Sequence, residues 1–120
     1  MKSEVGYFDL DIYGSQTGTH YQQQLAMKLY LTVAERLSAT KAAERKCAGL
    51  EKDNPITFLI QTVCLLDAHL VESPEWWSDN GMDLIDTDPV YEMAKVLREK
   101  QQEAAEKKSG GKVKKDEPAV

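Results

Sequence analysis

The most apolar stretch of the chain runs from Ile56 to Val71, between two prolines. Its apolar residues recur at helical spacing and extend round much of the helix: Ile56, Leu59, Ile60, Val63, Leu66 and Leu70 form one stripe, and Phe58, Cys64 and Leu65 lie opposite. A helix that is apolar on most sides is packed on more than one side. Asn54 is a suitable cap, and Pro55 suits the first helical position. The pattern therefore predicts a central helix from Asn54 to about Glu72.

A second long pattern precedes the central helix. Apolar residues repeat every four positions in the first part of Thr19–Lys46: Tyr21, Leu25, Leu29, Val33 and Leu37. The second part is rich in Ala, Lys, Glu and Arg, which favour helices. Gly49 is a plausible stop. The sequence predicts one helix over Thr19–Lys46.

Two further cap-and-proline pairs follow the central helix. Ser73-Pro74 predicts a short helical turn that carries Trp76 and Trp77. Asp88-Pro89 predicts a third helix, whose apolar face is formed by Val90, Met93, Ala94 and Leu97. After Leu97 the apolar face ends, so residues 101–120 are expected to be a polar helix end and a disordered tail.

The N-terminal segment has a different period. Phe8, Leu10 and Ile12 alternate with Asp9 and Asp11, which is typical of a strand. No second strand is evident in the rest of the sequence. A single strand leaves its backbone groups unpaired, so residues 1–18 are interpreted as an extended arm on the helices. Pairing with another copy or with a partner is the alternative.

Together these patterns predict an all-α fold of three main helices and a short tryptophan-bearing turn. The expected organisation is an N-terminal arm (1–18), a helical domain (19–100) and a polar C-terminal tail (101–120).

Charge and composition exclude several functions. The chain has a net charge of −5, and residues 1–100 alone carry −6. An acidic body disfavours nucleic-acid binding, which needs clustered Lys and Arg. The central apolar stretch is shorter than the roughly 20 residues of a membrane span. With no signal-peptide pattern and two cysteines read as free thiols, Cys47 and Cys64, a soluble cytoplasmic protein is expected.

No catalytic, cofactor-binding or metal-binding constellation is evident. His20 and His69 are far apart in the sequence and are interpreted as structural. The acidic run Asp79–Asp88 does not match a calcium-binding loop and is expected to be a solvated loop with a cap at Asp88. Residues 72–92 nevertheless hold seven Asp and Glu and no Lys or Arg, so this surface could steer a basic partner.

Aromatic side chains are the candidates for protein binding. Trp76 and Trp77 are adjacent, so on a helix they point about 100° apart. One is expected in the core and the other at the surface, where tryptophan favours interfaces. The candidate partner-binding residues are Trp76, Trp77, Tyr91 and Phe8.

The order of motifs from Asn54 to Val96 resembles a known protein family. It runs from an Asn-Pro helix start through a Leu-rich helix to Glu72-Ser-Pro-Glu-Trp-Trp77, then Asp79-Asn-Gly-Met-Asp-Leu-Ile-Asp86 and Pro89-Val-Tyr-Glu-Met-Ala94. With the preceding Ala-, Lys- and Arg-rich helix, this resembles the tail assembly chaperones of long, non-contractile-tailed bacteriophages, comparable to the shorter chaperone of phage lambda. The resemblance covers roughly residues 20–100.

The resemblance implies a function in virion assembly. Such a chaperone binds the tape-measure protein, keeps it soluble and helps to recruit tail-tube subunits through a longer frameshift product. The slippery codons would encode Gly111-Lys112. The implied protein is not an enzyme, is an oligomer, acts in the host cytoplasm and is absent from the mature virion. The alternative is a small helical adaptor or connector that remains in the phage particle.

Overall fold

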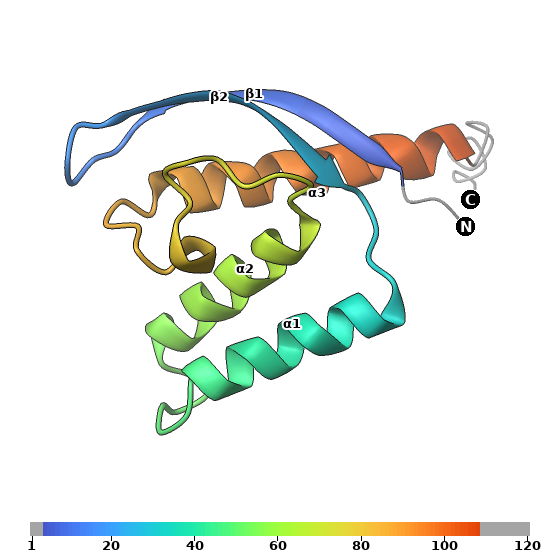
Figure 1. The fold of residues 1–120 in the computed structure, drawn as a ribbon. Helices are drawn as coiled ribbons and strands as arrows, with labels where there is room; N and C mark the ends of the chain where they lie inside the picture. Colours follow the sequence, from blue (N-terminus) through green and yellow to red (C-terminus); the bar gives the residue numbers. More distant parts are fainter. Residues whose placement is uncertain (1–3, 109–120) are drawn as a thin grey trace, which may run out of the picture.

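The computed structural model describes residues 4–108 of the chain. In order, its elements are β1 (Val5–Tyr13), β2 (His20–Lys28), α1 (Val33–Lys46), α2 (Pro55–His69), the 3₁₀ turn η1 (Asp79–Gly81) and α3 (Asp88–Lys108). Figure 1 shows the hairpin and α1 on opposite sides of α2, with α3 along the hairpin. The fold is α+β, so the predicted all-α class is wrong.

The N-terminal segment is half of a hairpin rather than an isolated arm. β1 pairs antiparallel with β2 along its whole length, from Val5 opposite Lys28 to Tyr13 opposite His20. The alternation of apolar and acidic residues in β1 therefore predicts a strand correctly, and the strand that pairs with β1 lies in the same chain. The prediction of an arm without a strand partner in the same chain is therefore wrong, because Val5–Tyr13 form one strand of the hairpin.

The predicted helix over Thr19–Lys46 is wrong in its first half. An apolar residue every fourth position lies on one face of a helix, but it also lies on one face of a strand, whose period is two. Tyr21, Leu25 and Leu29 fit both, and the strand places Met27 on the same buried side. Tertiary pairing with β1 decides between the two periods.

The helical half starts at a capping box that the sequence contains. The Thr32 hydroxyl accepts from Glu35 N–H at 3.1 Å, and the Glu35 carboxylate accepts from Thr32 N–H at 2.9 Å. This exchange satisfies two N–H groups at the helix start. At the other end Cys47 caps α1, and Gly49 has a positive φ of 88°, as expected for a helix stop.

The predicted start of the central helix is confirmed. The Asn54 side chain caps α2 by accepting from Ile56 N–H at 2.9 Å, and Pro55 is the first helical residue. The helix ends at His69, three residues before the predicted Glu72. The chain then turns along β2, where Val71 N–H donates to Ala26 C=O at 3.0 Å.

After Ser73-Pro74, where the sequence predicts a short helical turn, the tryptophan-bearing segment forms turns. Trp77 N–H donates to Pro74 C=O, which closes one turn, and η1 follows. Asp79 and Asn80 both have positive φ, near 53° and 55°. Left-handed backbone of this kind breaks a continuous helix.

The third helix begins at Asp88-Pro89, as predicted. Three residues of its expected apolar face are buried, namely Val90, Met93 and Leu97, and Ala94 is partly buried. The helix continues into the polar sequence as far as Lys108. Residues 109–120, where the disordered tail is expected to begin, lie outside the described part.

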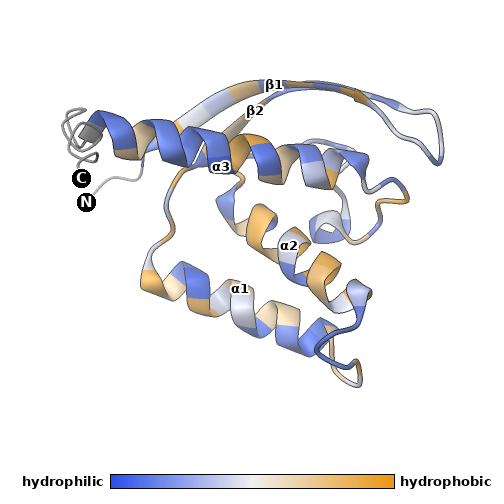
Figure 2. Ribbon diagram, turned by 180° about the vertical axis from the view of Figure 1, so that it is seen from behind, coloured by the Kyte–Doolittle hydropathy of each residue, from blue (hydrophilic) through white to orange (hydrophobic). Residues whose placement is uncertain are grey.

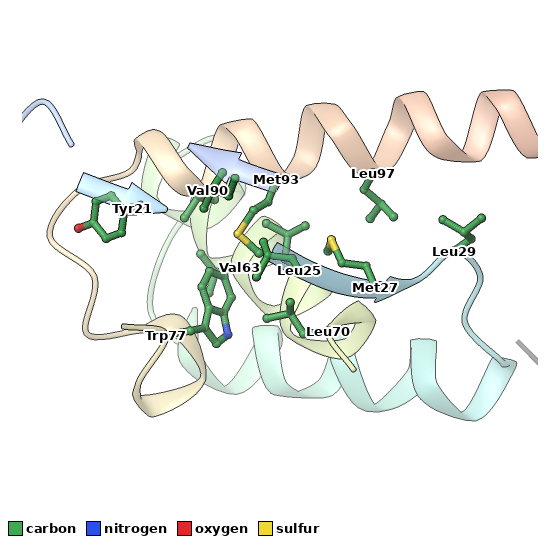
Figure 3. Packing of buried hydrophobic residues seen from close by; sticks show 12 residues of the cluster. Tyr21, Leu25, Met27, Leu29, Val63, Leu70, Trp77, Val90, Met93 and Leu97 are labelled. Carbon is green, nitrogen blue, oxygen red and sulfur yellow. The ribbon is translucent and has the colours of Figure 1, made fainter. Parts of the chain in front are cut away.

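One hydrophobic core joins the hairpin, α2 and α3. Figure 3 shows its side chains converging between these elements. The buried cluster consists of Leu10, Tyr21, Leu25, Met27, Leu29, Val63, Leu66, Leu70, Trp77, Val90, Met93 and Leu97. α1 contributes none of them and packs chiefly on α2 through Ala39 and Ala43, so this helix lies outside the main core. Figure 2 shows apolar residues concentrated in α2, whereas α3 is mostly polar toward its C-terminal end.

Candidate protein-binding surface

Trp77 is a core residue. Only 2% of it is exposed, and its indole N–H donates to Asp67 Oδ1 at 2.9 Å. The ring fits closely over Gly81, where a Cβ atom would come within 2.7 Å of it. Figure 3 shows the ring pointing toward Val63 on α2. A partner cannot reach this side chain in the folded protein.

Trp76 is partly buried and keeps some surface. Its ring meets Tyr21 edge-on at a centroid distance of 5.0 Å and Trp77 at 6.2 Å. Its indole N–H is buried without a hydrogen-bond partner in the described part of the chain. Of the two tryptophans, only Trp76 has area to offer a partner.

The other two candidate residues are not gathered with the tryptophans. Tyr91 is 49% exposed on α3. Phe8 is partly buried and packs against the core from the inner side of β1. Within residues 4–108, neither makes a ring contact with Trp76. The four predicted residues therefore do not form one aromatic surface.

The acidic loop before α3 is not simply solvated, contrary to expectation. Asp86 is completely buried and accepts from Gln16 N–H, Thr17 N–H, Thr17 Oγ1 and Tyr21 Oη at 2.6–3.0 Å. Asp88 accepts from Ser15 N–H and Oγ. These bonds fasten the hairpin turn to the start of α3, which is a structural role.

The bonds to Asp86 also set its ionisation. Hydrogen bonds lower the pKa of Asp86 to about 2, and the bond from the Thr17 hydroxyl has the largest effect. The bonds from Tyr21 Oη and the backbone N–H groups add to it, and together they outweigh burial, which raises the pKa. Burial, with the hydrogen bond to Asp86 next, raises the pKa of Tyr21. Asp86 is thus a carboxylate at neutral pH, as its four donors require.

The histidines and cysteines also have structural surroundings. His69 is buried, its Nδ1–H donates to Lys28 C=O at 2.6 Å, and burial lowers its pKa. His20 pairs with Asp11 at 2.6 Å and stacks on Tyr13. Burial raises the pKa of Cys64, which disfavours a reactive thiolate. No group of three His, Cys, Asp or Glu in the described residues could hold a metal ion.

The open surface lies beside α1 and α2. A depression of about 560 Å³ runs between the two helices, with Cys47, Leu50, Thr57 and Leu65 among its lining residues. A second, of about 340 Å³, is lined by residues from the β2–α1 connection, α1, α2 and α3: Leu29, Tyr30, Leu31, Arg36, Thr40, Leu65, His69 and Gln101. Thr40 and Leu65 line both depressions, so the two lie side by side, and together they are named here the α1–α2 groove.

Large apolar side chains are exposed along this groove. Leu65 is 45% exposed, Leu50 at one end is 38% exposed, and Phe58 is 63% exposed. Phe58 lies two turns before Leu65, hence on the same side of α2. Alanine-based packing leaves α1 too thin to cover them. Exposed apolar residues in a row mark protein-binding sites, so this groove is the best candidate surface.

The sequence contains a signal for this groove that lies outside the predicted aromatic residues. Phe58 and Leu65 stand opposite the main stripe of the central helix, and only Ala-rich α1 was available to cover that side. A small-residue helix cannot bury two large side chains. The groove is open because the large side chains on this face of α2 meet only small side chains on the facing side of α1.

No family model, curated protein or solved structure matches the chain. None of the helices within residues 4–108 is long and apolar enough to cross a membrane.

Proposed function

We propose that the protein is a phage tail assembly chaperone that holds a helical segment of the tape-measure protein in the α1–α2 groove. The observation that carries the proposal is the groove itself, with Leu65 and Leu50 exposed between polar rims. An amphipathic helix binds such a groove by inserting apolar residues at positions i, i+3, i+4 and i+7. The tape-measure protein is long and largely helical in the family that this chain resembles.

Features of the groove suit transient binding. Its rims carry Arg36, Glu44 and Lys52, so a partner helix would find charged neighbours of both signs around an apolar floor. α1 packs chiefly on α2 and contributes no residue to the main core. A chaperone must release its client, and a shallow groove outside the main core favours release.

The remaining parts of the proposal follow from the family resemblance. The chaperone acts in the host cytoplasm as an oligomer, keeps the tape-measure protein soluble and is absent from the mature virion. A longer frameshift product, which departs at the codons of Gly111-Lys112, recruits the tail-tube protein.

Co-expression tests the proposal directly. The tape-measure protein from the same genome is expressed with the wild-type chain or with Leu65→Asp or Leu50→Ser, both at residues that line the groove, and its soluble fraction is measured. The wild type should raise that fraction, and each groove variant should lose most of the gain. Ile85→Asp is the matched control, because Ile85 is 70% exposed and does not line the groove.

The proposal is wrong if the groove variants solubilise the client as well as the wild type does. Mass spectrometry of purified virions supplies a second test. A stoichiometric amount of the protein in the particle would support the structural adaptor instead of the chaperone.

A further inference from the structure

The two edges of the hairpin differ in how their backbone groups are used. Two hydrogen bonds mark the ends of the ladder: Gly14 N–H to Thr19 C=O at 2.8 Å and Leu29 N–H to Glu4 C=O at 2.7 Å. Hydrogen-bonded pairs alternate along an antiparallel ladder. The even-numbered residues of β1 therefore bond to β2, and the odd-numbered ones direct their N–H and C=O groups away from it.

The outer edge of β2 is partly occupied. Lys28 C=O accepts from His69 Nδ1–H at 2.6 Å, and Ala26 C=O accepts from Val71 N–H at 3.0 Å. The even-numbered residues of β2 lie opposite the odd-numbered residues of β1, so their N–H and C=O groups should point away from β1. The bonds made by Ala26 and Lys28 agree with this assignment. The chain leaving α2 thus covers the C-terminal half of this edge.

The outer edge of β1 is open in the described part of the chain. Its outward-directed backbone groups belong to Val5, Tyr7, Asp9, Asp11 and Tyr13, and none bonds to another described residue. The same five residues are exposed. The strand contains no proline and pairs with β2 without a bulge. Prolines and bulges are features that usually prevent an edge strand from pairing with another chain. Because β1 has neither, its edge can accept another strand.

Charge indicates what kind of strand fits. Asp9 and Asp11 stand on the outer face of the hairpin, where their neighbours across the ladder are Gln24 and Gln22. Asp11 also contacts His20 Nε2 at 2.6 Å, whereas the Asp9 carboxylate has no ion pair within residues 4–108. Lys28 is the one Lys or Arg in the two strands, and it pairs with Glu35 on α1 at 2.5 Å. A second copy would bring two more aspartates beside this pair. Like charges on adjacent strands repel, whereas opposite charges attract.

We propose that the open edge of β1 binds an extended segment of a partner protein in which basic residues alternate with apolar ones. The basic side chains lie beside Asp9 and Asp11 on the outer face. The apolar side chains lie on the inner face beside Phe8 and Ile12, which are only partly buried and border the core. This surface is separate from the α1–α2 groove and goes beyond the proposed chaperone activity.

A peptide of alternating Lys and Val, about seven residues long, tests the proposal with the full-length chain. Binding is measured by calorimetry, and amide exchange is measured with and without peptide. We expect binding, together with new protection of the Tyr7, Asp9 and Asp11 amides. The same peptide with Glu in place of Lys should bind at least about tenfold more weakly. No binding of the Lys peptide, or equal binding of the Glu peptide, overturns the proposal.

Two proline variants separate the two edges. Asp9→Pro removes an outward N–H from β1 without breaking the ladder, and should weaken binding by about tenfold or more, since edge pairing loses backbone bonds. Gln24→Pro is the matched control, because Gln24 lies directly opposite Asp9 and its N–H points to the other edge. Asp9→Asn, which removes only charge, should weaken binding less than Asp9→Pro.

Circular dichroism and the melting temperature establish that the variants fold. Wild-type affinity for Asp9→Pro, or equal loss for Gln24→Pro, contradicts the assignment of the edge. Sedimentation identifies the competing occupant: a wild-type dimer that Asp9→Pro converts to a monomer would show that a second copy takes the edge, and would overturn the proposed partner. The groove variant Leu65→Asp should leave peptide binding unchanged.

Discussion

Asp86 holds the hairpin turn in a site that excludes water. Its oxygens accept from Gln16, Thr17 and Tyr21, and Gly14 lies against the carboxylate with no room for a side chain. A Cβ atom on Gly14 would lie 2.0 Å from Asp86 Oδ2. At the scale of single residues, this pair connects two segments that are far apart in the sequence.

Gly14→Ala should therefore destabilise the fold by about 3 kcal/mol, because overpacking a tight site forces displacement of its neighbours. Thermal or urea unfolding measures the effect. Gly6→Ala is the comparison and should cost less: its Cβ atom would lie 3.0 Å from Leu29 Cδ2 and 3.2 Å from Lys100 Cδ, so these side chains need to shift by only a few tenths of an ångström. Equal losses for the two variants would contradict a rigid contact at Asp86.

The pKa of Asp86 predicts an acid-dependent stability. The folded-state pKa, about 2, lies below the ordinary value of 3.8. The stability from this group is therefore complete above about pH 4 and is lost as the pH falls toward 2. Asp86→Asn should lower the melting temperature at pH 7, and the difference from the wild type should shrink between pH 4 and pH 2. A difference independent of pH would exclude ionised Asp86 as the stabilising form.

At the scale of elements, the stability of α1 depends on capping interactions at its ends more than the stability of α2 or α3 does. It packs chiefly on α2 and starts at the capping box of Thr32 and Glu35. Lys28 adds a hydrogen bond to the Glu35 carboxylate, and this bond is the first cause of the lowered pKa of Glu35. Local stability in α1 should be the lowest among the helices, because few buried apolar contacts oppose its opening.

Thr32→Ala removes the cap and should destabilise the protein by about 1 kcal/mol. Hydrogen exchange in the first turn of α1 should accelerate before exchange in α2 or α3 does. Ser38→Ala, at an exposed position in the middle of α1, is the control and should be neutral or slightly stabilising. Unchanged exchange in Thr32→Ala would show that the cap does not limit opening.

At the scale of the whole molecule, α2 connects every layer. Leu66 on this helix is 1% exposed and lies in the core formed with the hairpin and α3. Its neighbour Leu65 faces the α1–α2 groove and is 45% exposed. One helix therefore supplies both the core and the candidate binding surface.

Leu66→Asp should unfold the domain, because an unpaired charge in the core costs about 4 kcal/mol or more. Leu65→Asp makes the same chemical change one residue away and should leave the cooperative melting transition in place. Circular dichroism during heating compares the two. A folded Leu66→Asp variant would contradict the described core, and an unfolded Leu65→Asp variant would remove the control for the groove experiments.

The sequence by itself determined the features that depend on neighbouring residues. The cap at Asn54-Pro55, the start at Asp88-Pro89, the stop at Gly49 and the buried face of α3 follow from local hydrogen bonding and helical spacing. The strand character of β1 was also evident from its alternation. The candidate site was predicted only in part, since Trp77 is a core residue and the groove at Leu65 was not identified.

Only the tertiary structure decided the features that depend on distant partners. An apolar repeat of four residues fits both a helix and a strand, so β2 required β1 to fix its period. The sequence predicts Asp86 to be a surface residue. In the structure it is buried, because the hairpin turn supplies N–H donors from about 70 positions away in the sequence. The groove exists because α1 packs on α2 through Ala39 and Ala43 and leaves Leu65 uncovered. The open edge of β1 exists because described residues cover only the other edge of the hairpin. Long-range pairing and packing are not encoded in any short stretch of sequence.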